Sequence, residues 1–206
     1  MRKIHLLISR IPLRRQQQFI ASAVDATIRQ LFPAKYAGLC HVYAIVGSNV
    51  LSIVLGHHYI PVAGLGVIDA GGGCFLEMLD NAAFNRERGG SFHCWIESAD
   101  LAEIELIDFT FRHNAVYAAT QGIKWRNKGK AYLWGLKSDL LLDVDQSKLP
   151  KVFPDGKVWF QKTDEGAIFI KKHIAEHMNA HIKITRHVLK RLSLELEIFL
   201  AKKDLS

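Results

Sequence analysis

The segment from Leu39 to Leu55 constrains the fold most, because it is apolar on nearly every side. Gly38 precedes it, and its length suits a helix rather than a strand. A helix without a polar face has to be covered on several sides. The rest of the chain must therefore supply enough helix and sheet to enclose it, and 206 residues, of which 49% are hydrophobic, suffice for such a core.

Two further helices are predicted on either side of this segment in the sequence. Between Leu13 and Leu31, apolar residues recur at helical spacing, and Pro33 marks the end of the pattern. Polar residues, Asp25 among them, are expected to fill the exposed face of this helix. A long amphipathic helix is predicted near the end of the chain, from about Ala167 to Lys202.

The middle of the chain has the pattern of an antiparallel sheet. Short apolar runs are separated by glycine clusters, such as the turn signal Gly71-Gly72-Gly73. The predicted strands are Tyr59–Asp69, Cys74–Leu79, Ser91–Ser98, Glu103–Phe111 and Lys157–Gln161. Helices at both ends and a sheet between them predict one α+β domain over residues 1–206.

The hairpin that joins the third and fourth of these strands brings together an imidazole and a carboxylate. A four-residue loop, Ala99-Asp100-Leu101-Ala102, would place His93 opposite Asp108 and Trp95 opposite Leu106. Directly opposed side chains have Cβ atoms about 4.5–5.5 Å apart, which allows a hydrogen bond between the two groups. The pairing depends on the loop length, because a three- or five-residue loop would destroy it.

An oriented imidazole can activate a nucleophile only if one lies beside it, and Cys40 is the best-placed candidate for this nucleophile. We expect His93 to donate its Nδ1–H to Asp108, which leaves Nε2 as a base. Cys40 is predicted in the first turn of the buried helix, where the helix dipole and free N–H groups favour a thiolate. Cys94 is expected to point to the opposite face of the sheet from His93, and we interpret it, like Cys74, as a structural thiol.

This order of residues resembles the papain-like cysteine proteinase superfamily in its transglutaminase-like branch, and a bacterial group of that fold more than any well-studied enzyme. The matching segments are Gly38-Leu-Cys40-His, Phe92-His93-Cys-Trp95-Ile-Glu and Leu106-Ile-Asp108-Phe-Thr. The resemblance implies a papain-like fold with N-terminal helices, an antiparallel sheet and a long C-terminal helix. It also implies that Cys40 is the nucleophile, His93 the general acid and base, and Asp108 the orienting carboxylate of a peptidase, amidase or acyltransferase.

Papain-type enzymes complete the oxyanion hole with a glutamine a few residues before the cysteine. Residues 33–38 contain no glutamine, and Gln30 lies farther back. Tyr36 is a weak candidate for substrate binding in this region, and Trp95 is a second one. The expected partner is a peptide or a small amide or acyl substrate, and no cofactor or metal is expected in this reaction.

Two other functions are compatible with the sequence. The motif His173-x-x-Glu176-His177 would place two histidines on one helix face, as in a zinc hydrolase, with Glu195 or Glu197 as a third ligand. Alternatively, an inactive papain-like fold could serve as a basic binding module. The formal charge of +7 supports this interpretation, as do the lysines and arginine of residues 124–130, but no nucleic-acid motif accompanies them.

The expected compartment is a reducing one. Three cysteines are a poor basis for a disulfide scaffold, because one is always left over. The N-terminal apolar run ends at Ser9, short of the roughly 7–15 apolar residues of a signal peptide, and no segment has the roughly 18 apolar residues of a membrane span. These features predict a cytoplasmic protein without a membrane partner.

Overall fold

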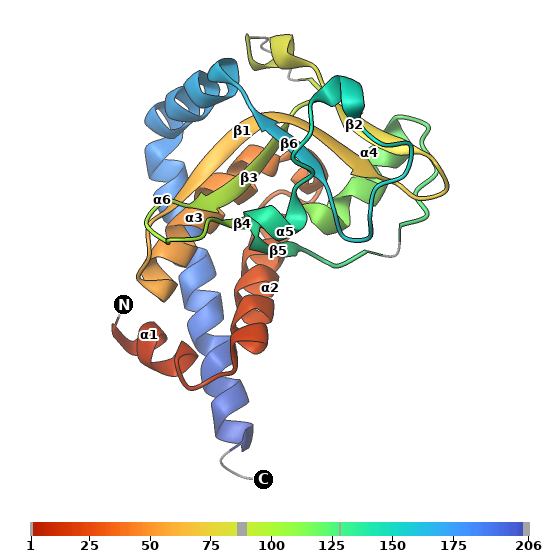
Figure 1. Cartoon of the computed structure of the whole chain (residues 1–206). Coiled ribbons are helices and arrows are strands. Elements are labelled where there is room, and N and C mark those ends of the chain that lie inside the picture. The colour runs from red at the N-terminus through yellow and green to blue at the C-terminus, as the bar shows by residue number, and fades with distance from the viewer. Residues whose placement is uncertain (1, 86–89, 128, 204–206) are drawn as a thin grey trace.

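The computed structural model describes residues 2–85, 90–127 and 129–203 (Figure 1). Its helices are α1 (Arg2–Ile8), α2 (Leu13–Leu31), α3 (Cys40–Leu55), α4 (Asn114–Thr120), α5 (Lys137–Leu140) and α6 (Asp164–Lys203). Its strands are β1 (Tyr59–Asp69), β2 (Phe75–Met78), β3 (His93–Ser98), β4 (Glu105–Asp108), β5 (Leu133–Leu136) and β6 (Trp159–Lys162). The α+β class, the antiparallel sheet and the long C-terminal helix are therefore as predicted.

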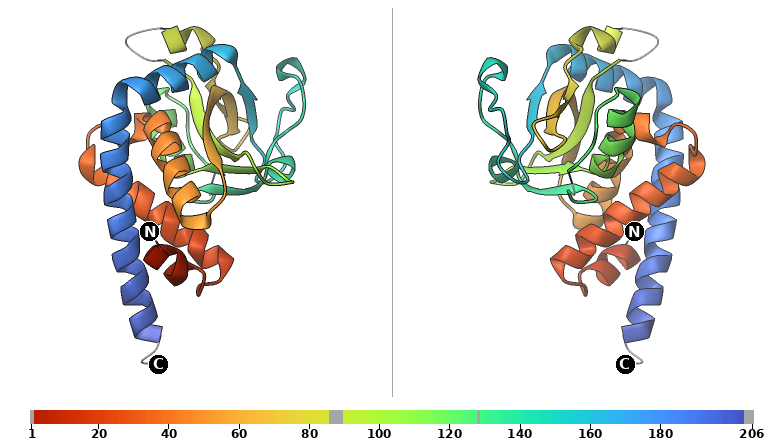
Figure 2. Two further views of the ribbon diagram at one scale, coloured as in Figure 1. Left: turned by 90° about the vertical axis from the view of Figure 1, so that its left-hand side faces the viewer. Right: turned by 90° about the vertical axis from the view of Figure 1, so that its right-hand side faces the viewer.

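Helix α3 lies between the sheet and the other long helices (Figures 1 and 2). On one side it packs against β1 and β3, and on the other it contacts α2 and α6. Its residues from Val42 to Val54 are mostly buried, as the lack of a polar face predicts. Helix α6 contacts both α1 and α2, and the three helices cover the side of α3 that the sheet leaves open.

The long strand β1 organises the sheet. It pairs antiparallel with β2, β3 and β6, and the order then continues from β3 to β4 and β5. Gly64 pairs with His93 of β3 on one edge and with Lys162 of β6 on the other. A Cβ atom at Gly64 would collide with the backbone oxygen of Gln161, so only glycine allows this close approach of the strands.

The predicted register of the β3–β4 hairpin is wrong by two residues. Ile96 pairs with Ile107, and Glu97 pairs with Leu106, because the loop contains six residues, 99–104, and not four. His93 is therefore diagonal to Asp108 rather than directly opposite. Side chains alternate with a period of two, so a shift of two keeps both residues on the same face, where the diagonal separation of about 7–8 Å between backbones remains within reach of long side chains.

Helix α3 is held close to β3 and β4 by a glycine. A Cβ atom at Gly47 would come within 2.7 Å of Ile96 Cδ1 and 2.8 Å of Phe109 Cε2. The helix ends at Gly56, whose φ of 78° lies in the left-handed region. Close packing along the whole helix fixes the position of its first residue, Cys40, relative to the sheet. None of the described helices has the length and apolar composition needed to span a membrane.

Asp25 is not on the exposed face of α2, contrary to the prediction. Its side chain is buried and accepts hydrogen bonds from Tyr43 Oη at 3.0 Å, His113 Nε2 at 2.7 Å and Arg112 Nη1 at 3.0 Å. Burial alone would raise the pKa of Asp25, but these donors and the two basic side chains lower it. The carboxylate thus joins α2, α3 and the short turn Phe111–His113.

Candidate active site

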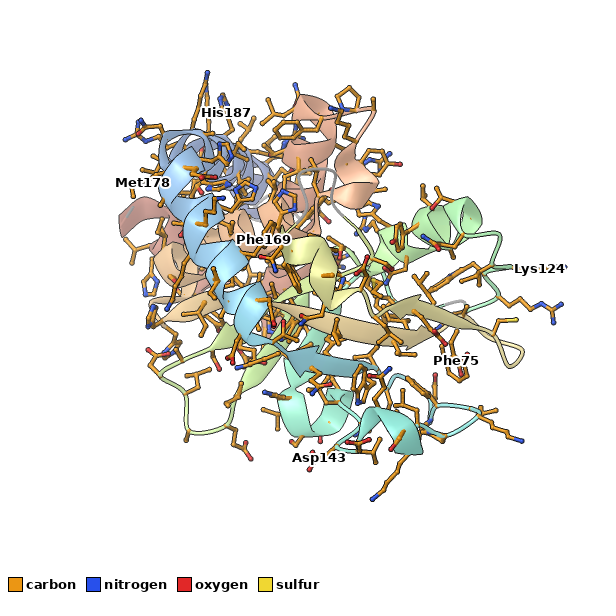
Figure 3. All side chains as sticks on the ribbon, turned by 90° about the horizontal axis from the view of Figure 1, so that it is seen from above. Phe75, Lys124, Asp143, Phe169, Met178 and His187 are labelled. Atoms are coloured by element: carbon orange, nitrogen blue, oxygen red, sulfur yellow. The ribbon has the colours of Figure 1, made fainter. Side chains whose placement is uncertain are left out.

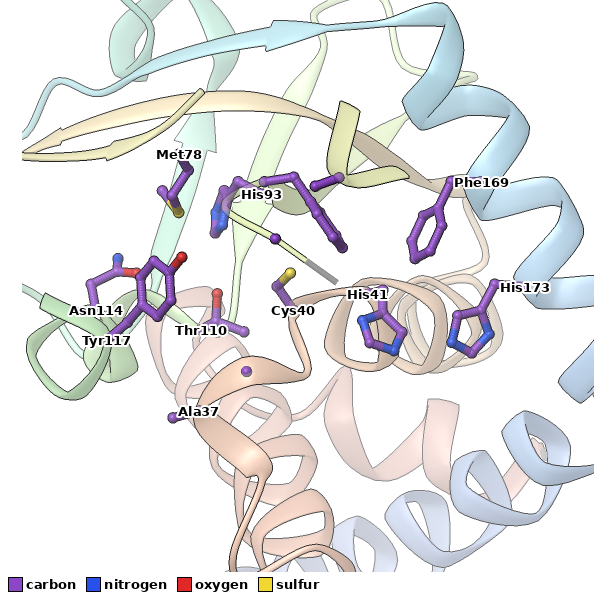
Figure 4. Close-up of a pocket in the computed structure, with 14 residues that line it drawn as sticks. Ala37, Cys40, His41, Met78, His93, Thr110, Asn114, Tyr117, Phe169 and His173 are labelled. Carbon is purple, nitrogen blue, oxygen red and sulfur yellow. The ribbon is translucent and has the colours of Figure 1, made fainter. Parts of the chain in front are cut away.

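A pocket of about 420 Å³ lies where the first turn of α3 meets the sheet and α6 (Figure 4). Cys40, His93 and Thr110 line it near its centre, as the close-up shows. Volumes of roughly 300–1,000 Å³ are usual for small-ligand sites. The other described residues of its wall are Ala37, Gly38, His41, Met78, Ala83, Gly90, Phe92, Asn114, Tyr117, Phe169 and His173.

Cys40 occupies the first position of α3, as predicted. Leu39 precedes it as the N-cap and forms no side-chain hydrogen bond, and Tyr43 provides the first N–H that bonds back, to the Leu39 carbonyl. The N–H groups of the first turn, that of Cys40 included, therefore have no partner within the helix. They favour negative charge on the sulfur and can donate to an oxyanion that forms beside it.

The His93–Asp108 pair is present, with the two imidazole nitrogens in exchanged roles. His93 Nε2, and not Nδ1, lies 3.1 Å from Asp108 Oδ2, so Nδ1 is the nitrogen left for proton exchange. The other carboxylate oxygen, Oδ1, accepts from the backbone N–H and the hydroxyl of Thr110 at 2.7 and 2.6 Å. Both members of the pair are deeply buried, at 2% and 1% exposed.

Cys94 points away from His93, as predicted, but it affects the thiol of Cys40. The face that it occupies is the one covered by α3. Interaction with the Cys94 thiol and with His41 lowers the pKa of Cys40, and the nearby His93 acts in the same direction. Together they outweigh burial and hold the pKa of Cys40 well below its usual range, while burial and the interaction with Cys40 raise the pKa of Cys94.

The charge state of His93 matches that of the thiolate. Burial opposes the imidazolium form, but the charge and hydrogen bond of Asp108 and the negative charge on Cys40 outweigh it, so the pKa of His93 is raised. A lowered thiol pKa and a raised imidazole pKa favour a thiolate and an imidazolium in the same pocket. These forms provide a strong nucleophile and a proton donor.

The two predicted substrate-binding residues lie outside the wall of this pocket. Trp95 is buried, and its indole Nε1 donates to Glu97 at 3.0 Å, so it belongs to the core of the sheet. Tyr36 does not line the pocket, because its ring packs against His113 and beneath the guanidinium of Arg29. Gln30 is also remote from the pocket, since its side-chain oxygen accepts from Arg191 on α6.

Four histidines form a row from the pocket along α6, and sequence patterns missed its first member. His41 on α3 lies 4.5 Å from His173, whose ring is in turn 4.6 Å from His177 and 5.2 Å from His181, measured between centroids. Helix α6 is kinked at His177. Among the described residues, no group of three or more His, Cys, Asp or Glu side chains is arranged to hold a metal ion, so the alternative of a zinc hydrolase finds no support.

The histidine row predicts a loss of stability in acid. Burial lowers the pKa of His181 to about 4, and repulsion from His173, His177 and His41 acts in the same direction. As the pH falls, His181 in the unfolded chain therefore binds a proton near pH 6.5, whereas in the folded protein it binds one only near pH 4. The free energy of unfolding is expected to fall between pH 6.5 and pH 4, by at most about 3 kcal/mol from His181. Urea titrations across this range measure it.

The matched variant is His181→Leu, which keeps an apolar side chain in the buried position. It should flatten the pH dependence of unfolding below pH 6.5 relative to the unmodified protein. An equally steep decline in both proteins would mean that His181 is not the group responsible.

The comparisons with known proteins support the fold alone. No protein-family model and no curated protein matches the chain. The crystal structure of a genomics target is similar to it, with a TM-score of 0.55 and 15% identity over 88% of this chain and 78% of that one. This similarity extends over helices and sheet together.

Proposed function

We propose that the protein is a cysteine-dependent acyl-transfer enzyme with Cys40 as nucleophile, His93 as general acid and base, and Asp108 as the orienting carboxylate. The observation that carries this proposal is that His93, hydrogen-bonded to Asp108, lines the same pocket as a thiol at the uncapped start of a helix. The lowered pKa of Cys40 supports it.

In the proposed reaction, the thiolate of Cys40 attacks the carbonyl carbon of an amide, ester or thioester. The oxyanion accepts hydrogen bonds from the N–H groups of the first turn of α3. His93 gives its proton to the leaving atom as the C–N, C–O or C–S bond breaks, and a thioester remains on Cys40. Water or an amine then attacks the thioester, with His93 as base, and the thiolate is restored.

The papain-like fold in its transglutaminase-like branch is part of the same proposal. The chain order of cysteine at a helix start, histidine on a strand and aspartate on the next strand supports it. All three cysteines are free, which suits a reducing compartment such as the cytoplasm. The peptidase, amidase and acyltransferase versions share their first step and differ in the acceptor.

Alkylation by iodoacetamide as a function of pH tests the proposal without a known substrate. Because the thiolate is the reactive form, the rate at Cys40 should rise to its plateau with an apparent pKa well below the ordinary value of about 8.5. The rate is followed at the Cys40 peptide by mass spectrometry. Cys74 is exposed and provides an internal reference for an ordinary thiol.

The variant Cys94→Ala adds a second arm to this experiment. It removes the thiol whose interaction with Cys40 lowers the pKa of Cys40, so the apparent pKa should move back toward the ordinary value. If Cys40 in the unmodified protein titrates together with Cys74, the activated nucleophile is wrong. If the Cys94→Ala profile is unchanged, the thiolate owes its stability to His41, His93 and the helix instead.

A further inference from the structure

The pocket has two halves of different chemistry, and Cys40 lies between them (Figure 4). On the side of His93 are Met78, Thr110, Asn114 and Tyr117. On the other side are His41, Phe169 and His173, and Phe92 belongs with them because its ring lies 5.1 Å from that of Phe169.

The position of His93 decides which half receives which part of a substrate. A general acid has to lie within hydrogen-bond reach of the atom that it protonates. The leaving group must therefore lie in the half that contains His93. The acyl group, on the other side of the attacked carbon, must extend toward His41 and Phe169.

The half beyond His41 is built from rings. Phe169 lies 5.8 Å from His41 and 5.7 Å from His173 between centroids, and Phe84 packs behind it at 5.5 Å. Phe169 is half-buried, whereas Met178 on the same helix is exposed and lies at the rim in the view from above (Figure 3). The pocket wall, so far as its residues are described, contains no Asp, Glu, Lys or Arg. Burial also lowers the pKa of His173, which favours its neutral form. His41 Nδ1 and His173 Nδ1 are buried without a hydrogen-bond partner in the described structure, so the rings of this half also offer two imidazole nitrogens.

The half that contains His93 has an unused hydrogen-bond donor. Asn114 is only 5% exposed, and its side-chain Nδ2 has no hydrogen-bond partner in the described structure. A buried amide without a partner is costly, and a ligand that supplies an acceptor removes this cost. Tyr117, by contrast, already donates its hydroxyl to Ser91 at 3.1 Å.

We propose that the substrate is an uncharged, apolar acyl group joined to a leaving group that presents a hydrogen-bond acceptor to Asn114. The ring-lined half, formed by His41, Phe92, Phe169 and His173, takes the acyl group. This inference rests on the proposed function, because it requires Cys40 to be the nucleophile. It adds the substrate class, which neither the triad nor the fold determines.

Aryl esters test the acyl half. With an ester, the Cys40 sulfur forms a bond to the acyl carbon as the C–O bond breaks, the phenol takes the proton of His93, and water later releases the carboxylic acid. The acyl groups are acetyl, pentanoyl and glutaryl, the last two having equal carbon counts. Each buried methylene favours binding by about fourfold, so the p-nitrophenyl pentanoate, with three more methylenes, should react up to about 60-fold faster than the acetate. The glutaryl ester, whose end is charged, should lose this gain.

Two variants test whether the ring-lined half binds the acyl group. Phe169→Ala should reduce the preference for pentanoyl over acetyl, whereas Ile168→Ala, at a neighbouring side chain that is 64% exposed, should leave it unchanged. His173→Lys places a positive charge in the wall and should raise the rate with glutaryl relative to pentanoyl. This gain is informative even if Phe169→Ala does not fold.

Asn114→Ala tests the other half by comparing phenyl and 4-carbamoylphenyl esters of the same acyl group. The variant should lose rate with the carbamoyl ester, which carries an acceptor, by about tenfold relative to the phenyl ester, and its acyl preference should not change. Mass spectrometry of the Cys40 peptide separates the two proposals. No acylation by any ester would overturn the proposed function and this inference together. Acylation with equal rates for acetyl, pentanoyl and glutaryl would overturn the substrate class and leave the function standing.

Discussion

The variant Cys40→Ala is expected to lose acyl-transfer activity by about 10⁶-fold, because removing the nucleophile of a concerted catalytic group costs about as much as removing the whole group. Hydrolysis of p-nitrophenyl pentanoate, followed as released nitrophenolate, measures the loss. Alanine keeps the helical start of α3 and the half-buried position of the side chain. The free energy of unfolding should therefore change much less than the rate.

Cys74→Ala is the matched control, because Cys74 is exposed and lies outside the pocket wall. It should retain the activity of the unmodified protein. Residual activity in Cys40→Ala above a few per cent of the original would mean that another group performs the reaction.

The largest effect on stability is expected from Asp25→Ala. The substitution leaves Tyr43, His113 and Arg112 without their common acceptor at a buried position. Removing one partner of a buried charged network typically costs about 3–5 kcal/mol of unfolding free energy. Urea denaturation at pH 7 measures the difference between the variant and the unmodified protein.

The pH dependence of this difference provides a check on its cause. The folded-state pKa of Asp25 is lowered, so its contribution is fully present above the unfolded value of about 3.9 and is lost as the pH falls through the folded value. The difference between the two proteins should therefore shrink in acid below pH 4. Asp143→Ala is the control, because Asp143 is exposed at the edge of the molecule (Figure 3), and its effect should stay within about 0.5 kcal/mol. An equal loss in both variants would contradict the role of the buried network.

Local sequence patterns predicted the helices and strands well where the apolar residues of a segment determine by themselves which of its faces is buried. The apolar run Leu39–Leu55 gave α3 within one residue, and the strand Tyr59–Asp69 is the same in the sequence pattern and in the structure. The kink of α6 at His177 has no proline or glycine beside it, so no local signal marks it. The sequence patterns do not predict helix α5 and strand β5, because both elements are only four residues long.

The hairpin shows how a wrong register still led to the right pair. The loop between β3 and β4 is two residues longer than predicted, and the hydrogen-bonding nitrogen of His93 is Nε2 rather than Nδ1. The pair survives because a strand repeats every two residues, so an even shift keeps the same face. An odd shift would have separated His93 from Asp108.

The sequence by itself determined the long helices and most of the strands, the place of Cys40 at a helix start and the common face of His93 and Asp108, because each follows from a local period. Only the tertiary structure decided that Cys94 lowers the pKa of Cys40, that Asp25 is buried and that Phe169 enters the pocket wall. In each case the partner is distant in the sequence. The local sequence around a residue carries no information about side chains that other elements bring into contact with it. These contacts set the charge and the shape of the site.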